Sequence, residues 1–208
     1  PPPPPPPPFS SRRRHTRYAD RSRGLGDVYK RQDVVRAMRR WSDRLAAIDA
    51  ALRAPRTDDF HLTVQFLGNT AEEDVPAIGR ALQEAASELV AFDVRYRGLG
   101  AFPEPARARV VWAGAEEIEP AGRLARLAEV VGEALEPLGH APERRAWHPH
   151  VTLGRVRRRP SPALVAAVEA ASEEDLGEDR VSELKLILSA PGNRGYRYID
   201  LTTVELPG

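Results

Sequence analysis

The sequence predicts an α+β protein, on three observations. Several strand-like apolar segments follow one another without a helix between them, as in antiparallel sheets. Other segments repeat apolar residues every three or four positions, which is the spacing of an amphipathic helix. Two strand-like segments, one in each half of the 208-residue chain, carry the same His-x-Thr pattern and so indicate a weak internal duplication.

Residues 1–32 are expected to lie outside this fold as a non-native or disordered leader. They begin with eight prolines and have no apolar periodicity with which to bury a face. The stretches SSRRRHTRY and GDVYKRQ resemble translated sequencing-adapter sequence. The alternative interpretation is a basic arm that binds nucleic acid. The organised part of the chain is then residues 33–208, which we expect to form a single domain.

Two helices are predicted in the first half of this domain. The first begins at Asp33, and its apolar face consists of Val34, Met38, Trp41, Leu45, Ile48 and Leu52. The second follows Asn69 and Thr70, whose side chains are typical helix caps, with acidic residues next in the favourable first turn. Its apolar face consists of Val75, Ile78, Leu82 and Leu89.

Two strands and a third helix follow. Residues 91–103 and 109–117 are predicted as strands joined by a proline-rich connection. The third helix ends at Gly139, a residue typical of a helix C-terminus. Its apolar face consists of Leu124, Leu127, Val131, Leu135 and Leu138.

A short helix and a hairpin complete the chain. Residues 160–172 are predicted as the helix. Residues 182–190 and 197–206 are predicted as the two strands of the hairpin, around a turn at residues 191–195.

Composition narrows the class of protein. The chain contains no cysteine, which excludes disulfides, thiol nucleophiles and cysteine-ligated zinc. No apolar run approaches the roughly 20 residues of a membrane span, and we expect a cytoplasmic monomer that does not bind membranes. Positions 1–32 carry a charge of +6 and the whole chain +1, so the remaining residues carry −5. Bulk charge therefore does not favour nucleic-acid binding, and any contact with RNA has to be local.

The two His-x-Thr segments are FHLTVQFLG, residues 60–68, and WHPHVTLGR, residues 147–155. Side chains alternate between the two faces of a strand. The predicted apolar faces consist of Leu62, Val64 and Phe66 in the first segment, and of Val151 and Leu153 in the second. The predicted polar faces consist of His61, Thr63 and Gln65 in the first, and of His150 and Thr152 in the second. If the two segments lie side by side, two imidazoles and two hydroxyls converge.

This set of side chains suits a phosphodiester. The unperturbed histidine pKa of about 6.5 lets one imidazole act as a neutral base and the other as a protonated acid. Threonine hydroxyls donate hydrogen bonds to phosphoryl oxygens, so the chemistry requires neither a metal nor another cofactor. A single histidine in a strand is more often structural, and the signal here is the repetition of the pattern.

Two further residues of the second segment are ambiguous. On a straight strand Arg155 points to the apolar side with Val151 and Leu153, and it reaches the polar side only through a bulge near Gly154. The alternative is a surface arginine that leads into residues 157–159, all arginine. His148 is interpreted as a supporting or structural residue.

HLTVQFLG and HPHVTLGR resemble the two H-x-T-x motifs of the two-histidine (2H) phosphoesterase superfamily, in particular the RNA 2′,3′-cyclic phosphodiesterase or 2′-5′ RNA ligase-like family. GLGAFP with RVVWAG, and LILSAPGNRGYRYIDL, resemble that family's middle strands and C-terminal hairpin. The resemblance implies a bilobal fold with two antiparallel sheets and flanking helices around a central cleft. It also implies that His61 and His150 are catalytic, that Thr63 and Thr152 bind phosphate, and that Arg155 assists.

The resemblance implies metal-independent hydrolysis of RNA 2′,3′-cyclic phosphate ends, or of small cyclic nucleotides, to 2′-phosphates. The alternatives are 2′-5′ ligation of tRNA halves and a non-catalytic module that binds RNA ends. Members of the family usually begin with an apolar strand before the first helix, and here residues 1–32 stand in its place. The first native strand is therefore expected to be missing or replaced.

Overall fold

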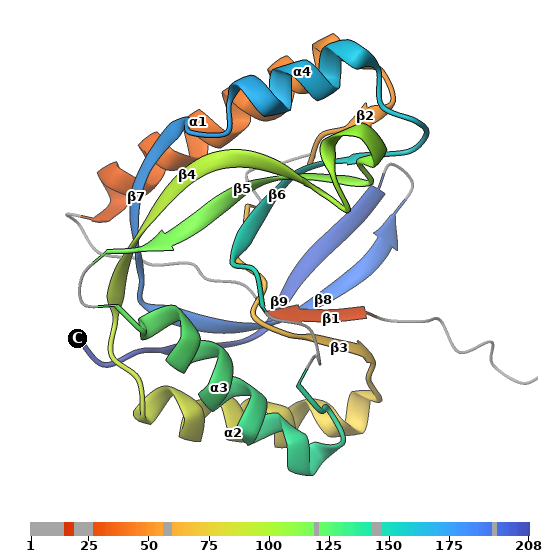
Figure 1. Ribbon diagram of the computed structural model, residues 1–208. Helices are drawn as coiled ribbons and strands as arrows, with labels where there is room; N and C mark the ends of the chain where they lie inside the picture. The colour runs from red at the N-terminus through yellow and green to blue at the C-terminus, as the bar shows by residue number, and fades with distance from the viewer. Residues whose placement is uncertain (1–14, 19–26, 56–59, 119–120, 143–146, 193–194) are drawn as a thin grey trace, which may run out of the picture.

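The computed structural model describes residues 15–18, 27–55, 60–118, 121–142, 147–192 and 195–208 (Figure 1). The first of its two antiparallel sheets contains, in spatial order, β3 (Phe66–Asn69), β1 (His15–Tyr18), β8 (Glu183–Gly192) and β9 (Gly195–Glu205). The second contains, in spatial order, β2 (Leu52–Arg53), β6 (His150–Val156), β5 (Val110–Glu117), β4 (Phe92–Phe102) and β7 (Asp175–Val181). The predicted α+β class is confirmed.

Helices cover the two sheets separately. Among the described residues the α-helices are α1 (Asp27–Ile48), α2 (Val75–Ser87), α3 (Arg123–Leu135) and α4 (Pro162–Ala170). Short 3₁₀ helices are η1 (Glu72–Asp74), η2 (Pro105–Arg107) and η3 (Glu136–Leu138). Helices α1 and α4 lie over the five-stranded sheet, and α2 and α3 lie at the other end of the molecule, where α2 packs against β8 and β9 (Figure 1). The expected two-lobed arrangement of sheets and flanking helices is confirmed. In the described part of the chain no helix is long and apolar enough to cross a membrane.

The predicted apolar helix faces form much of the core. Met38 and Leu45 of α1, Ile78 and Leu82 of α2 and Leu127 of α3 are almost completely buried. Burying each such side chain contributes roughly 1.5–3 kcal/mol, so these faces fix the helices on the sheets.

The first helix ends earlier than predicted, because a polar side chain bonds the backbone just after its last turn. Helix α1 ends at Ile48 because Asp49 Oδ1 accepts from the backbone N–H of Ala51 at 2.8 Å, which turns the chain into β2. Asp49 Oδ2 also accepts from the N–H of Ser161 at 2.7 Å. These backbone donors, Ser161 first, hold the pKa of Asp49 below its ordinary value. Leu52, predicted on the helix face, is buried in β2 instead.

The start of the second helix also differs from the prediction. The expected caps, Asn69 and Thr70, precede η1, and α2 itself begins at Val75. Pro76 in the first turn suits this position because it has no N–H to leave unpaired.

The strand β7 was not predicted. Its sequence, DLGEDRV, is largely charged, and only Leu176 and Val181 are buried. The strand lies at the edge of the five-stranded sheet and pairs with β4 alone. Pairing of the backbone, rather than apolar alternation, defines it, so no periodic signal reveals it in the sequence.

Residues 1–32 contribute more to the fold than expected. Residues 15–18 form β1, which pairs antiparallel with both β3 and β8, and α1 begins at Asp27. Residues of the leader thus stand in the place of the first strand and pair with N–H and C=O groups that β3 and β8 would otherwise expose. Residues 1–14 and 19–26, also assigned to the leader, lie outside the described residues.

Deletion of β1 is expected to destabilise the protein. Removal of residues 1–18 opens the four-stranded sheet between β3 and β8, and we expect the melting temperature to fall by about 5 °C or more. Removal of residues 1–14, which leaves β1 in place, is the control and should have little effect. Equal melting temperatures for the two truncated proteins in differential scanning calorimetry would show that β1 does not support the fold.

Candidate active site

The first His-x-Thr segment crosses from one sheet to the other. Leu62 forms an isolated antiparallel bridge with Val151 of β6, in the five-stranded sheet. Phe66, four residues later, begins β3 in the four-stranded sheet. The prediction of one continuous strand over this segment is therefore wrong.

The crossing also changes which side chains are buried. Gln65, predicted on the polar face, is buried, and its Nε2 donates to the carbonyl oxygen of His140 at 2.8 Å. Phe66, predicted on the apolar face, is 45% exposed. Alternation holds only while the chain stays in one sheet, so it fails at the point where the chain leaves β6.

The bridge brings the two motifs together. In an antiparallel pair the neighbours of bridged residues also face each other, so this register sets His61 opposite Thr152 and Thr63 opposite His150. Leu62 and Val151 are each 2% exposed and point to the core, whereas these four neighbours are half-buried on the other face. Each histidine is thus paired with the threonine of the other motif.

A bulge in β6 determines the direction of Arg155. In the pairing with β5, Thr152 and Gly154 face consecutive residues, so Leu153 between them is the extra residue of a β-bulge. Leu153 and Gly154 are both buried and Arg155 is exposed, so the alternation shifts by one position. Arg155 therefore returns to the face of His150 and Thr152, which a straight strand would not allow.

The hydrogen bonding of His150 selects one tautomer of its neutral ring. Its Nδ1 lies 2.7 Å from the backbone carbonyl oxygen of His148, and a carbonyl only accepts, so Nδ1 carries the proton. The other ring nitrogen, Nε2, is then an unprotonated acceptor in the neutral imidazole. Burial lowers the pKa of His150, and the nearby His148 and Arg155 lower it further, while the bond to His148 opposes the shift. His148 thus acts through its backbone, in line with its interpretation as a supporting residue.

Aromatic rings lie against both histidines. The Phe102 ring meets the His150 ring edge-on at a centroid distance of 4.9 Å, and Tyr198 of β9 meets His61 in the same way, also at 4.9 Å. Trp147 Nε1 donates to the carbonyl oxygen of Thr63 at 3.0 Å and so ties the start of the second motif to the first. Such contacts fix ring orientation more firmly than burial alone.

Trp112 extends this arrangement through a close approach to a glycine. Its ring packs 4.7 Å from the His148 ring and 5.3 Å from the Phe102 ring. Gly100 faces Trp112 across the β4–β5 pair, and a Cβ atom at Gly100 would overlap the indole ring. The absence of a side chain at Gly100 therefore leaves room for the Trp112 ring, which contacts Phe102 and His148.

The sequence matches a known protein family over most of its length. A model described as the 2′-5′ RNA ligase superfamily matches residues 31–192. The chain belongs to the 2′-5′ RNA ligase superfamily. Curated members include an RNA 2′,3′-cyclic phosphodiesterase of Aeropyrum pernix, 34% identical over 83% of this chain and 96% of the relative. Another, from Archaeoglobus fulgidus, has the same name and is 35% identical over 75% of this chain and 85% of the relative.

Solved structures show the same superfamily fold. TT0787 of Thermus thermophilus superposes with a TM-score of 0.73 at 26% identity, covering 93% of this chain and 98% of that chain. E. coli LigT, solved in complex with 3′-AMP, superposes with a TM-score of 0.63 at 22% identity, covering 94% and 99%. At this sequence identity, the similarity to LigT shows a shared fold and nothing more.

The structure brings together most of the residues that the repeated motif predicted for the candidate site. Thr63 and Thr152 lie where the repeated motif predicts them, next to His61 and His150. Among the aromatic residues of the middle strands and the second motif, Tyr96 is buried in the core, while Phe102 and Trp147 lie at the candidate site.

The contacts of Tyr198 and Trp112 were missed. These residues lie on β9 and β5, and only the register of the sheets brings them near the histidines. Within the described residues, no group of three or more His, Asp or Glu side chains is placed to hold a metal ion.

Replacement of Arg155 by glutamine is expected to raise the pKa of His150. Burial keeps this pKa below the ordinary value of about 6.5, and loss of the guanidinium removes one of the charges that lower it. NMR titration of the His150 ring protons measures the change. Arg126→Gln on α3, in the other lobe, should leave the midpoint unchanged; a lower midpoint in Arg155→Gln would contradict the assignment of Arg155 to this face.

Replacement of Gly100 by alanine should displace Trp112. We expect a loss of about 1–3 kcal/mol in the free energy of unfolding, because overpacking forces the ring and its neighbours to shift. Urea unfolding measures this loss. Gly79→Ala in α2 is the control, since its added Cβ meets Thr202 only at an ordinary 3.4 Å and alanine favours the helix. Equal stabilities of the two variants would exclude the proposed close approach.

Proposed function

We propose that the protein is a metal-independent RNA 2′,3′-cyclic phosphodiesterase that opens a cyclic phosphate to a 2′-phosphate. The observation that carries this proposal is the bridge between Leu62 and Val151, which sets each histidine opposite the other motif's threonine. Two groups that move protons and two hydroxyls that hold phosphoryl oxygens are what in-line displacement at phosphorus requires. The names of the curated relatives agree with this substrate class.

The hydrogen bond of His150 supports a division of roles. His150 Nε2 is the general base: it removes a proton from water, and the water oxygen attacks phosphorus. His61 is the general acid: as the bond between phosphorus and the 3′ oxygen breaks, it donates its proton to that oxygen. The sequence alone left these roles open, and the pKa of His150, lowered by burial, favours the neutral form that a base needs.

The threonines and Arg155 stabilise charge. The hydroxyls of Thr63 and Thr152 donate to the non-bridging phosphoryl oxygens, where negative charge accumulates in the transition state. Arg155, on the same face of β6, adds a cation whose planar donors fit a phosphate. We further propose that the enzyme acts as a monomer in the cytoplasm.

Loss of either histidine is expected to reduce hydrolysis of a 2′,3′-cyclic nucleotide by at least about 10²–10⁴-fold, the usual contribution of one acid or base. The assay separates 2′- from 3′-phosphate products by ³¹P NMR and is repeated with EDTA, which should not change the rate. His140→Ala, in the loop after η3, is the matched control and should retain activity. Full activity of His61→Ala or His150→Ala would overturn the proposal.

The same assay distinguishes the alternatives. A ligase uses the 5′-hydroxyl of a second RNA in place of water, so it would join tRNA halves faster than it hydrolyses the cyclic end. A module that only binds RNA ends would bind a 2′-phosphate without turnover.

A further inference from the structure

We propose that Arg53 is a second phosphate-binding arginine of the candidate active site, and that it holds, together with Arg155, the 2′-phosphate that the proposed reaction forms. This inference rests on the proposed function and adds a residue to its site. The repeated motif does not include Arg53, which lies on β2, ahead of the first His-x-Thr segment.

The register of the sheet sets Arg53 beside Arg155. The two residues are direct partners in the antiparallel pairing of β2 with β6, so their side chains leave the sheet on the same face. The preceding partners, Leu52 and Val156, are both buried in the core on the other face. Arg53 and Arg155 are both exposed, and they therefore lie on the face of the sheet that carries the candidate site.

A row of directly opposed residues connects this pair of arginines to the aromatic side of the site. Arg155 faces Val110 of β5, which in turn faces Phe102 of β4. The Phe102 ring contacts the candidate catalytic histidine of β6. Two residues further along β5, Trp112 faces Thr152. Because residues two apart in a strand are separated by about 7 Å, the two arginines lie one side-chain repeat beyond Thr152.

The backbone that carries Arg53 is fixed by its neighbours. After β2, the Arg39 side chain of α1 donates to the carbonyl oxygen of Pro55 at 2.7 Å. Strand β2 also lies close against β6, since a Cβ atom at Gly154 would overlap the Leu52 side chain. These contacts hold the backbone of Arg53 in place before any ligand binds.

The two arginines carry positive charge without a carboxylate partner. In the part of the chain that the structure describes, neither guanidinium contacts a carboxylate or forms a hydrogen bond. Other arginines of the same sheet do have such partners: Arg95 contacts Glu178 at 2.5 Å. Like charges that face each other directly across an antiparallel pair destabilise a sheet. An anion bound between Arg53 and Arg155 therefore relieves a repulsion that the free protein retains.

The charge of the pair matches the product of the proposed reaction. A 2′,3′-cyclic phosphate is a diester with one negative charge, whereas the 2′-phosphate formed from it is a monoester with a charge of about −1.5 to −2 at pH 7. The additional charge appears as the water oxygen bonds to phosphorus and the bond to the 3′ oxygen breaks. Planar guanidinium groups donate pairs of hydrogen bonds to phosphate oxygens, so a second arginine stabilises this charge.

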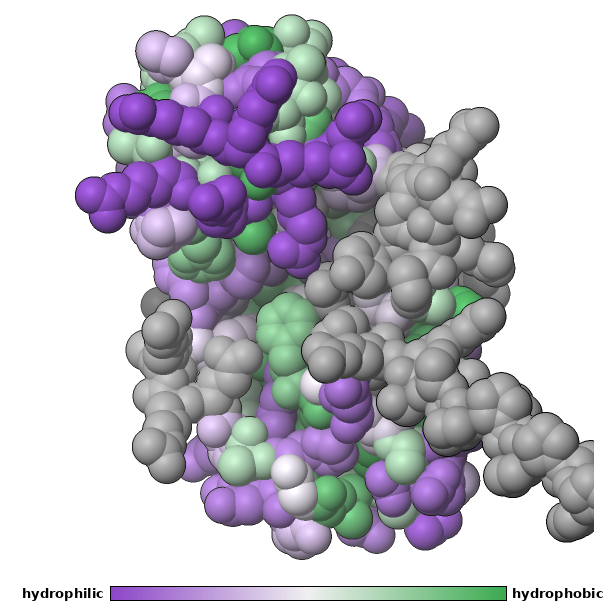
Figure 2. Space-filling view, turned by 90° about the vertical axis from the view of Figure 1, so that its right-hand side faces the viewer, coloured by the Kyte–Doolittle hydropathy of each residue, from purple (hydrophilic) through white to green (hydrophobic). Residues whose placement is uncertain are grey.

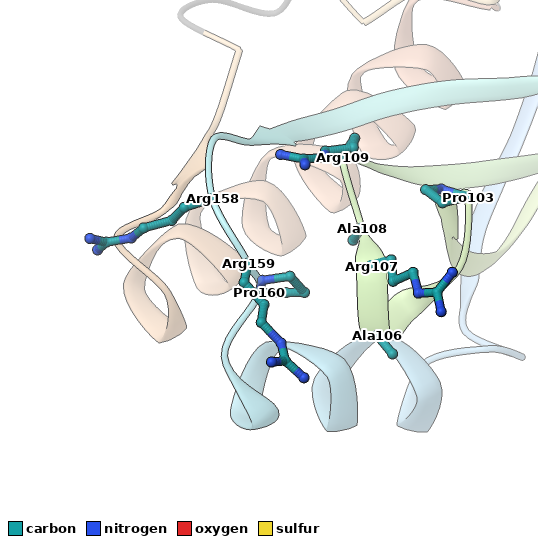
Figure 3. Close-up of a pocket in the computed structure, with 8 residues that line it drawn as sticks. All are labelled: Pro103, Ala106, Arg107, Ala108, Arg109, Arg158, Arg159 and Pro160. Atoms are coloured by element: carbon teal, nitrogen blue, oxygen red, sulfur yellow. The ribbon is translucent and has the colours of Figure 1, made fainter.

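Other arginines of this lobe form a separate basic surface. Figure 2 looks onto the side of the molecule on which Figure 1 places β2, and hydrophilic residues gather there over the lobe of the five-stranded sheet. Arg109 lines a cavity of about 510 Å³ between the β4–β5 and β6–α4 connections (Figure 3). It directly precedes Val110, so alternation along β5 directs it to the opposite face from Arg155. Arg109 is therefore a matched control for Arg53.

The first test measures binding without turnover. Wild-type protein, Arg53→Gln and Arg109→Gln are titrated with adenosine 2′-monophosphate in a calorimeter. We expect Kd to rise about tenfold in Arg53→Gln, because charge-assisted hydrogen bonds to the phosphate are lost, and to stay within about twofold in Arg109→Gln. An unchanged Kd in Arg53→Gln, or an equal loss in both variants, would overturn the inference.

The melting temperature distinguishes phosphate binding from a structural role. Without ligand, Arg53→Gln should melt at the wild-type temperature or up to about 3 °C above it, because one of two opposed charges has been removed. Added adenosine 2′-monophosphate should raise the melting temperature of the variant less than that of the wild type, since this gain depends on affinity. A lower melting temperature of the free variant would show that Arg53 supports the fold instead.

Turnover tests the link to the proposed function. For a 2′,3′-cyclic nucleotide, kcat/KM should fall about tenfold in Arg53→Gln and stay within about twofold in Arg109→Gln. If wild-type protein binds the 2′-monophosphate but hydrolyses no cyclic nucleotide, the proposed function fails, while weaker binding by Arg53→Gln still supports the assignment of Arg53. Full activity of Arg53→Gln would contradict a role in the reaction.

Discussion

The site depends on a single antiparallel bridge between Leu62 and Val151. Both side chains are 2% exposed, and burying each contributes roughly 1.5–3 kcal/mol, so the apolar sides of the two motifs are fixed in the core. The polar sides then have no freedom to separate, because neighbouring residues of an antiparallel pair must face each other. The geometry of the candidate site therefore follows from the packing of the core.

Residues around the candidate site orient the two histidine rings. The backbone carbonyl of His148 fixes the proton on His150, and the aromatic rings of Phe102 and Tyr198 lie edge-on against the two histidines. Trp112 supports the His150 side, which requires Gly100 to have no side chain. A site built in this way presents nitrogen atoms in set directions before any substrate arrives, which is the condition for efficient proton transfer.

Sequence patterns predicted those features of the fold in which burial repeats at a regular spacing. The helix faces with Met38, Leu45 and Leu82 were correct, as was the pairing of the two motifs, because burial repeats with the geometry of the element. They failed where the chain leaves one sheet for another at Gln65 and Phe66. The charged strand β7 and the register that brings Tyr198 to His61 both depend on tertiary pairing, which leaves no local pattern in the sequence.

Strand β1 is held in the four-stranded sheet through its backbone. The strand comes from the far N-terminal part of the chain, and its partners β3 and β8 hold it through backbone hydrogen bonds on both sides. These bonds are made by backbone groups, which every residue except proline carries in full. The place between β3 and β8 is thus filled through main-chain groups, in a different sheet from the one that contains β6 and the candidate site.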